Sequence, residues 1–223
     1  PQGGSASPLL SNIYLHYVLH LWFAQEVIPR LQGRAFMIRF ADDAVMGFEL
    51  LEDAEKVLNV LPKRVGKYSL TVHPDKTRLV AFGRPGPTQG NKPGTFDYLG
   101  LTHYWGKSHR GKWIVKQKTA RQRLSRGFKR IAQWCRRNRH LPVSEQHQEL
   151  CRKLRGHFAY YGITGNGLWL KKFEQGVRRI WRKWLHRRSR SSTDMPWDRF
   201  THLMERYRFP PPRVVHSVYA AKP

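Results

Sequence analysis

The sequence contains few cysteines and no long apolar run. Its 223 residues include only Cys135 and Cys151, which form no Cys-x-x-Cys pair. This scarcity argues against a disulfide framework or a zinc finger, and it indicates reduced thiols in a cytoplasmic protein. The best apolar stretch near the start, residues 18–24, contains His20 and is too short to span a membrane. No secretory signal is recognisable.

Acidic side chains are also scarce, and their scarcity is uneven. Asp and Glu number 15 against 41 Lys and Arg, a net charge of +26. Residues 1–100 hold 11 basic and 9 acidic side chains, whereas residues 101–223 hold 30 and 6. The second half repels itself unless a polyanion is near, so nucleic acid is the expected partner. An anionic membrane surface is the less favoured alternative, because Trp and Phe recur at core spacing there.

The pattern of apolar residues predicts an α+β first half followed by an all-helical second half, joined near residue 116. Four Gly and three Pro within residues 83–94 indicate a loop inside the first half. Asn166 is predicted to cap the third helix of the second half. Helices are expected at residues 8–27, 52–68, from 117, 144–160, from 166 and 196–207, and strands at 34–40, 44–50, 78–82, 96–99, 102–105 and 113–115.

Asp42 and Asp43 are adjacent acids on the predicted hairpin turn between two apolar strands. Carboxylate oxygens are the ligands that Mg²⁺ prefers, and two such ions can activate a primer hydroxyl and stabilise a leaving pyrophosphate. Neighbouring residues on a strand point to opposite faces, so we expect Asp42 to be the direct ligand and Asp43 to support it. Ordinary turn chemistry is the alternative for this dipeptide taken alone.

Several segments resemble one protein family, in the order that the family has. Residues 1–16, PQGGSASPLLSNIYLH, resemble the Pro-Gln-Gly block of group II intron reverse transcriptases, and FADD at 40–43 resembles their Tyr-Ala-Asp-Asp box. PDKT at 74–77, FDYLG at 96–100, LRGHFAYYGITGN at 154–166 and PRVVHS at 212–217 are similar to later blocks. The chain is therefore expected to belong to an RNA-directed DNA polymerase with a maturase role. Phe40 departs from the family by replacing Tyr.

The resemblance implies a domain layout. Residues 1–115 would be the C-terminal part of a polymerase palm, an antiparallel sheet with packed helices. Residues 116–223 would be a helical thumb or maturase domain that binds RNA. In this family the fingers and a first palm strand, which carries another metal-binding Asp, precede the Pro-Gln-Gly block. We therefore expect a fragment that does not polymerise alone.

The resemblance also implies partners and site residues. A two-ion Mg²⁺ site would involve Asp42 and Asp43, and incoming deoxynucleotides would lie near Gln2, Gly3, Gly4, Phe40 and Lys76. Intron RNA and an RNA/DNA template–primer would lie along the basic helices, in a bacterial cytoplasm. No acid occurs between Lys107 and His140, so an ordinary solvated face is a weak explanation. The expected nucleic-acid contacts are Arg121, Arg123, Arg126, Lys129, Arg130, Lys171, Lys172, Arg178 and Arg182.

Two other functions stay open at this level. One is a non-enzymatic maturase that binds intron RNA and assists splicing. The other is a decayed remnant with neither activity, which would fail to fold. Zinc binding by Cys135, His140, His147 and Cys151 is disfavoured, because their spacing matches no finger.

Overall fold

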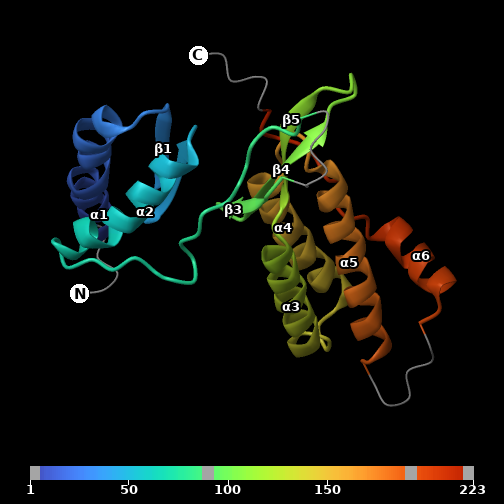
Figure 1. Cartoon of the computed structure of the whole chain (residues 1–223). Helices are drawn as coiled ribbons and strands as arrows, with labels where there is room; N and C mark the ends of the chain where they lie inside the picture. Colours follow the sequence, from blue (N-terminus) through green and yellow to red (C-terminus); the bar gives the residue numbers. More distant parts are fainter. Residues whose placement is uncertain (1–5, 87–92, 189–194, 218–223) are drawn as a thin grey trace. The chain divides into compact units, whose positions relative to one another are not determined.

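The chain divides into two compact units, residues 1–81 and 82–223 (Figure 1). The computed structural model describes residues 6–86, 93–188 and 195–217. The units are mixed α/β and contain two small antiparallel sheets, one in each unit. The predicted α+β class is thus confirmed. The packing boundary at 81/82 differs from the functional boundary predicted near 116, which stays a prediction.

The first unit begins with one long helical run, as predicted. α1 (Ser7–Leu15) continues through the π-helical segments η1 (His16–Leu21) and η2 (Phe23–Val27) and ends in the 3-10 turn η3 (Ile28–Arg30). Pro29 lies in that last turn, where its fixed φ is tolerated. Phe23 and Val27 are buried against Val57 of α2 (Leu51–Gly66). The run therefore forms one layer of the unit's core.

A two-stranded hairpin forms the other layer. β1 (Ala35–Phe40) pairs antiparallel with β2 (Asp43–Phe48), so both predicted strands are confirmed, with ends that differ by one or two residues. Met37 of β1 packs on the helical core, while its neighbours along the strand face outward. The buried Asp53 of α2 accepts backbone hydrogen bonds from Gln32 at 3.0 Å and Gly33 at 2.9 Å. This carboxylate fastens α2 to the loop that enters β1.

The second unit begins with a three-stranded antiparallel sheet. Its strands are β3 (Phe96–Tyr98), β4 (Leu101–Lys107) and β5 (Trp113–Thr119), in the order β3-β4-β5. Two predictions about this region are wrong. Residues 78–82 make no strand pairing in the described part of the chain, and the helix expected from residue 117 begins at Arg121. Gln117 instead pairs with His103 of β4, because backbone pairing with β4 continues to Thr119.

Four helices complete the described part of the second unit, as predicted. They are α3 (Arg121–Arg137), α4 (Val143–Tyr161), α5 (Gly167–His186) and α6 (Trp197–Arg206). The buried face of α5 differs slightly from expectation, because Leu170, Trp181 and Leu185 are buried while Trp169 and Trp184 lie half-buried at its border. The shared core of the helices consists of Ile131, Cys135, Leu150, Cys151, Leu154, Phe158, Leu170, Phe173, Val177, Trp181, Leu185, Phe200, Met204 and Phe209.

α3 and α5 approach closely through two glycines, each lying against an aromatic ring of the other helix. A Cβ on Gly127 would lie 2.9 Å from the ring of Phe173, and one on Gly176 would lie 2.3 Å from the ring of Phe128. The two rings stack with centroids 5.2 Å apart. Small residues therefore allow this helix pair to interlock.

Asn166 joins the sheet to the helices. It stands at the N-cap position of α5 as predicted, but its side chain makes no cap hydrogen bond. Its Oδ1 accepts from the Thr119 amide at 2.9 Å, and its Nδ2 donates to Thr119 Oγ1 at 2.9 Å and to the Tyr161 carbonyl at 2.8 Å. The buried amide thus ties the end of β5, the end of α4 and the start of α5 together.

The C-terminal segment lies along the loop between α4 and α5. The amides of Val215 and His216 both donate to the Gly162 carbonyl, at 2.7 and 2.9 Å, and Ile163 forms a parallel bridge with His216. A side chain on Gly162 would collide with the Phe158 carbonyl, 2.2 Å from the Cβ position. Glycine is therefore required where this segment docks. None of the described helices is both long and apolar enough to cross a membrane.

Candidate metal site and nucleic-acid surface

The hairpin turn presents Asp42 and Asp43. Phe40 and Asp43 form the last β1–β2 pair, so Ala41 and Asp42 are the two turn residues. Ala41 has φ 53°, a left-handed conformation that hairpin turns of two residues require and that glycine adopts most easily. Asp43 belongs to β2 rather than to the turn, which corrects the predicted boundary. Both carboxylates are exposed and make no hydrogen bond or ion pair within the described residues.

Arg39 connects this turn to α1. Its guanidinium donates to the Ala41 carbonyl at 2.7 Å and to Asn12 Oδ1 at 3.1 Å. Asn12 lies in the first sequence block and Arg39 directly precedes the second, so the structure brings those two blocks together. Sequence reasoning missed both residues, since a single Arg and a single Asn carry no periodic signal. These hydrogen bonds connect the left-handed turn to α1.

The two carboxylates fit part of a Mg²⁺ site. Their hard oxygens suit the ion, and they lack a basic partner in the described structure. Among residues 6–86, 93–188 and 195–217, however, no group of three or more His, Cys, Asp or Glu side chains gathers as a metal site would. Within the described residues, the turn therefore offers two carboxylate donors.

An apolar surface lies beside the acids. Phe36, Ile38 and Phe40 alternate along β1 and face outward, with 57%, 54% and 64% of their surfaces exposed. The Phe36 ring covers Gly47 on the paired strand, because a Cβ there would lie 2.4 Å from it. Phe40, the expected nucleotide contact, thus has an exposed ring and pairs directly with Asp43 across the two strands.

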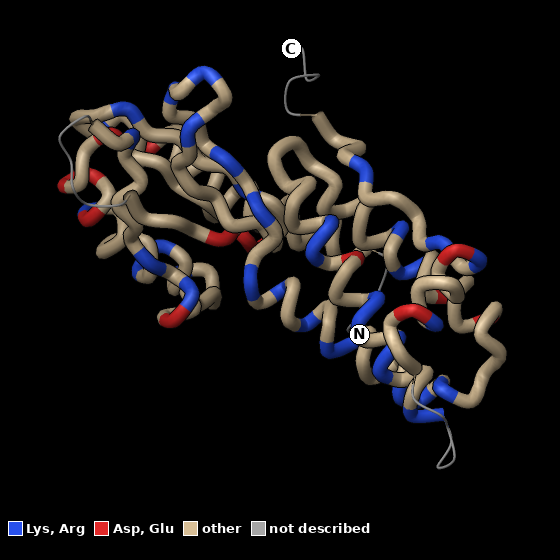
Figure 2. Tube along the Cα trace, turned by 90° about the vertical axis from the view of Figure 1, so that its right-hand side faces the viewer, with Lys and Arg blue, Asp and Glu red and all other residues tan. Residues whose placement is uncertain are grey.

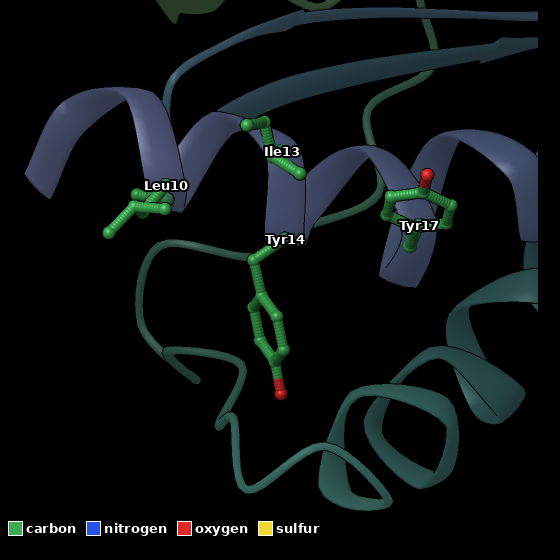
Figure 3. Close-up of a pocket in the computed structure, with 5 residues that line it drawn as sticks. Leu10, Ile13, Tyr14 and Tyr17 are labelled. Carbon is green, nitrogen blue, oxygen red and sulfur yellow. The ribbon is translucent and has the colours of Figure 1, made fainter. Parts of the chain in front are cut away.

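A second apolar surface lies on the first helical run. A shallow hollow is lined by Leu10, Ser11, Ile13, Tyr14 and Tyr17 (Figure 3). The Tyr14 hydroxyl donates to the Tyr68 carbonyl at 2.7 Å, which anchors that ring to the end of α2. The hollow contains no acid and no base, so it has no catalytic chemistry of its own.

The other expected nucleotide contacts are less defined. Gln2, Gly3 and Gly4 lie outside the described residues. Lys76 lies in a turn whose amides, those of Lys76 and Thr77, donate to the His73 carbonyl. Its side chain is exposed without an acidic partner in the described structure. A point charge at this position is available to a phosphate.

The first unit is similar to a known protein family. Residues 1–103 match the family model described as reverse transcriptase (RNA-dependent DNA polymerase). The match contains the whole first unit, with the Asp42–Asp43 turn, and ends within β4. No curated protein matches the chain. The two exposed acids thus lie within the segment that matches this reverse transcriptase model.

Beyond the reverse transcriptase match, α3 carries the predicted basic residues on its exposed surface. Figure 2 shows Lys and Arg recurring along the helices of the second unit. None of the five predicted α3 residues makes an ion pair in the described structure, and Arg126 donates a 3.4 Å hydrogen bond to Gln122 on the same helix. The five exposed residues are Arg121, Arg123, Arg126, Lys129 and Arg130. Their charges are therefore available to phosphates.

The four predicted residues of α5 differ in whether their charged groups are free to bind phosphate. Lys171 and Lys172 are exposed without acidic partners in the described structure. Arg178 forms an ion pair with Glu174 on the same helix. Arg182 donates to the Met195 carbonyl at 2.9 Å, and its guanidinium lies 4.2 Å from the Trp197 ring centroid. The two arginines are thus already engaged within the protein.

The residues considered for zinc have structural contacts. His147 Nε2 lies 3.2 Å from Cys151 Sγ and 2.9 Å from the Arg208 carbonyl. Cys135 is fully buried, and burial raises the pKa of its thiol to about 12. A thiol with that pKa stays protonated at neutral pH, so Cys135 behaves as a core residue.

Proposed function

We propose that the chain is part of an RNA-directed DNA polymerase of the group II intron type, with residues 1–115 in its palm and 116–223 in an RNA-binding thumb or maturase domain. The supporting observation is the reverse transcriptase match across the hairpin that presents Asp42 and Asp43 without partners in the described structure. The substrates would be deoxynucleotides and an RNA template with its primer. A bacterial cytoplasm is the proposed location.

Asp42 would hold a Mg²⁺ ion directly, and Asp43 would support it. When bound, Mg²⁺ lowers the pKa of the attacking primer hydroxyl and neutralises charge on the leaving pyrophosphate. The protein's own part is positional. Arg39 fixes the Ala41 carbonyl, and Asn12 ties Arg39 to α1, so the turn keeps one orientation. Phe40 and Lys76 would contact the incoming nucleotide.

We also propose that this chain alone does not polymerise. Its described residues bring no third carboxylate, cysteine or histidine to the two acids. Two exposed carboxylates hold a hydrated Mg²⁺ weakly, because the ion dehydrates reluctantly and needs near-octahedral ligands.

Primer extension on an RNA template tests the polymerase assignment, using the protein that carries this chain. Replacing Asp42→Asn removes the proposed ligand charge with little change in size. Loss of a group that merely orients a metal ligand costs about 10–100-fold, so loss of the ligand itself should exceed about 100-fold. Glu55→Gln is the matched control, because Glu55 is an exposed acid on α2 without a partner in the described structure. Equal activity of both variants would contradict the assignment.

A splicing maturase is the second candidate, favoured by the exposed, unpaired basic face of α3. Structured RNA is recognised mainly through its backbone and shape, for which such a face is suited. The two functions separate by variant. Asp42→Asn should abolish DNA synthesis and spare RNA binding, whereas Arg126→Gln with Arg130→Gln should weaken RNA binding. Loss of both properties in Asp42→Asn would show that the turn is structural.

A further inference from the structure

One face of the β4–β5 hairpin carries lysines beside aromatic rings. Tyr104 pairs with Lys116, and Thr102 pairs with Lys118. Because side chains alternate along strands, these four residues share one face of the sheet. The opposite face is occupied differently, since Trp105 donates from Nε1 to the Phe82 carbonyl at 2.9 Å. The lysine-bearing face is thus distinct from the side that packs on residue 82.

Two lysine ammoniums, that of Lys118 on this face and that of Lys172 on α5, lie near aromatic rings. Lys118 Nζ lies 4.9 Å from the Tyr104 ring centroid and 5.7 Å from that of Trp169. Lys172 Nζ lies 4.4 Å from the Trp169 centroid. One half-buried indole therefore has two cations beside it, one from β5 and one from α5. Cation–π attraction restricts these otherwise mobile side chains.

A third lysine extends the group toward the hairpin tip. Lys116 Cδ would lie 2.9 Å from a Cβ on Gly106, so its stem crosses β4 where glycine leaves room. We call Lys116, Lys118 and Lys172 the lysine row. Asp97 is the nearest acid by strand register, but it accepts a hydrogen bond from Thr102 Oγ1 at 2.5 Å. None of the row forms an ion pair in the described structure.

The relative placement of the row is fixed by buried contacts. Lys118 directly precedes Thr119. The Thr119 amide donates a hydrogen bond to Asn166 Oδ1, and Thr119 Oγ1 accepts one from Asn166 Nδ2. Asn166 directly precedes α5, which carries Trp169 and Lys172. Because both joint residues are fully buried, β5 and α5 cannot separate without losing these bonds. The row therefore has a set geometry before any ligand arrives.

We propose that the lysine row is a contact site for the phosphodiester backbone of RNA, separate from the exposed faces of α3. Three cations that form no ion pair with the described residues repel one another and gain from a polyanion. Ordering flexible lysines costs affinity on binding, and here the rings and the Asn166 joint have already restricted them. The proposal rests on the RNA-binding role of the second unit and assigns Lys116 and Lys118, with Tyr104 and Trp169 as their supports.

Binding of a labelled RNA hairpin to the full chain, across about 50–200 mM NaCl, tests the row. Lys118→Gln with Lys172→Gln removes two charges. We expect about tenfold weaker binding at low salt and a salt slope smaller by about 1 to 2. Lys63→Gln with Lys67→Gln is the matched control. It removes the same net charge from exposed positions of the first unit, so affinity should stay close to that of the unchanged chain. Equal losses in both pairs, or no loss in either, would overturn the proposal.

Two further variant pairs separate packing from charge. Lys118→Arg with Lys172→Arg keeps both charges and their ring contacts, so it should retain affinity. A loss as large as that of the Gln pair would show that the rings stabilise the fold only. Arg126→Gln with Arg130→Gln tests the α3 surface independently. If the α3 pair weakens RNA binding and the Lys118→Gln, Lys172→Gln pair does not, the lysine row alone is rejected. If the unchanged chain does not bind RNA, both the lysine row and the RNA-binding role of the second unit are rejected.

Discussion

At the scale of single residues, His157 is a half-buried histidine packed among aromatic rings. Its ring stacks on Phe173, with centroids 3.7 Å apart, and lies 4.6 Å from Tyr161. Its Nε2 atom is buried with no hydrogen bond in the described structure. Burial lowers the pKa of His157 to about 4. The folded chain therefore binds a proton here less readily than the unfolded chain does.

This residue should make the helical unit sensitive to acid. Between about pH 6.5 and pH 4 the unfolded state binds more protons at His157, so the free energy of unfolding falls as pH falls through that window. The loss from this group amounts to roughly 3 kcal/mol below pH 4. His157→Phe keeps the ring stack and removes the titratable group. It should therefore reduce the dependence of the free energy of unfolding on pH.

Urea midpoints measured at several pH values check this expectation. His109→Gln, an exposed histidine on the β4–β5 turn, is the control and should leave the curve unchanged. Burial also lowers the pKa of His103, so some acid sensitivity should persist in the variant. An unchanged acid loss in His157→Phe would contradict the assignment.

At the scale of secondary-structure elements, the α3–α5 interlock should govern stability. Gly176→Ala places a methyl group against the stacked Phe128 ring, so overpacking of about 1–3 kcal/mol should exceed the gain in helix propensity of about 1 kcal/mol. Gly156→Ala is the matched control, because a Cβ there meets nothing within 4 Å on the same kind of helix interior. Thermal unfolding should show Gly176→Ala destabilised and Gly156→Ala stabilised. Equal shifts would mean that the rings move aside freely.

Sequence periodicity predicted most elements but not their joints. The helices of the second unit and the strands β1 and β2 follow from local patterns, and they were confirmed. The boundary between β5 and α3 was misplaced, because pairing of Gln117 with His103 depends on a distant strand. The role of Asn166 was also mistaken, since its partners Thr119 and Tyr161 come together only in the fold. The acidic turn was predicted from its motif, whereas the Arg39–Asn12 contact was not.

At the scale of the whole molecule, the excess of positive charge should oppose folding. Residues 101–223 hold 30 basic and 6 acidic side chains, so the folded second unit brings like charges together. The Debye length falls from about 30 Å at 0.01 M salt to about 10 Å at 0.1 M. Added NaCl should therefore raise the melting temperature of the chain.

Circular dichroism melts at several NaCl concentrations check this behaviour. A short RNA hairpin should raise the melting temperature further at low salt, because it binds the folded state. The increase in melting temperature that RNA causes should become smaller as the NaCl concentration rises, because salt weakens RNA binding. A melting temperature that depends on neither NaCl nor RNA would argue that the basic side chains lie too far apart to repel one another.

The docking of residues 215 and 216 on Gly162 has a consequence for synthesis on the ribosome. Gly162 and Ile163 are made about fifty residues before the segment that pairs with them, as the 52-residue separation of Thr164 and His216 shows. Phe209, which joins the helical core, is also made late. The first unit can therefore fold while translation continues. The second unit completes its packing only after residues 209–216 have been synthesised. Until then the nascent chain exposes incompletely packed helices that carry many Lys and Arg side chains. Ribosomal RNA is a nearby polyanion to which these side chains can bind.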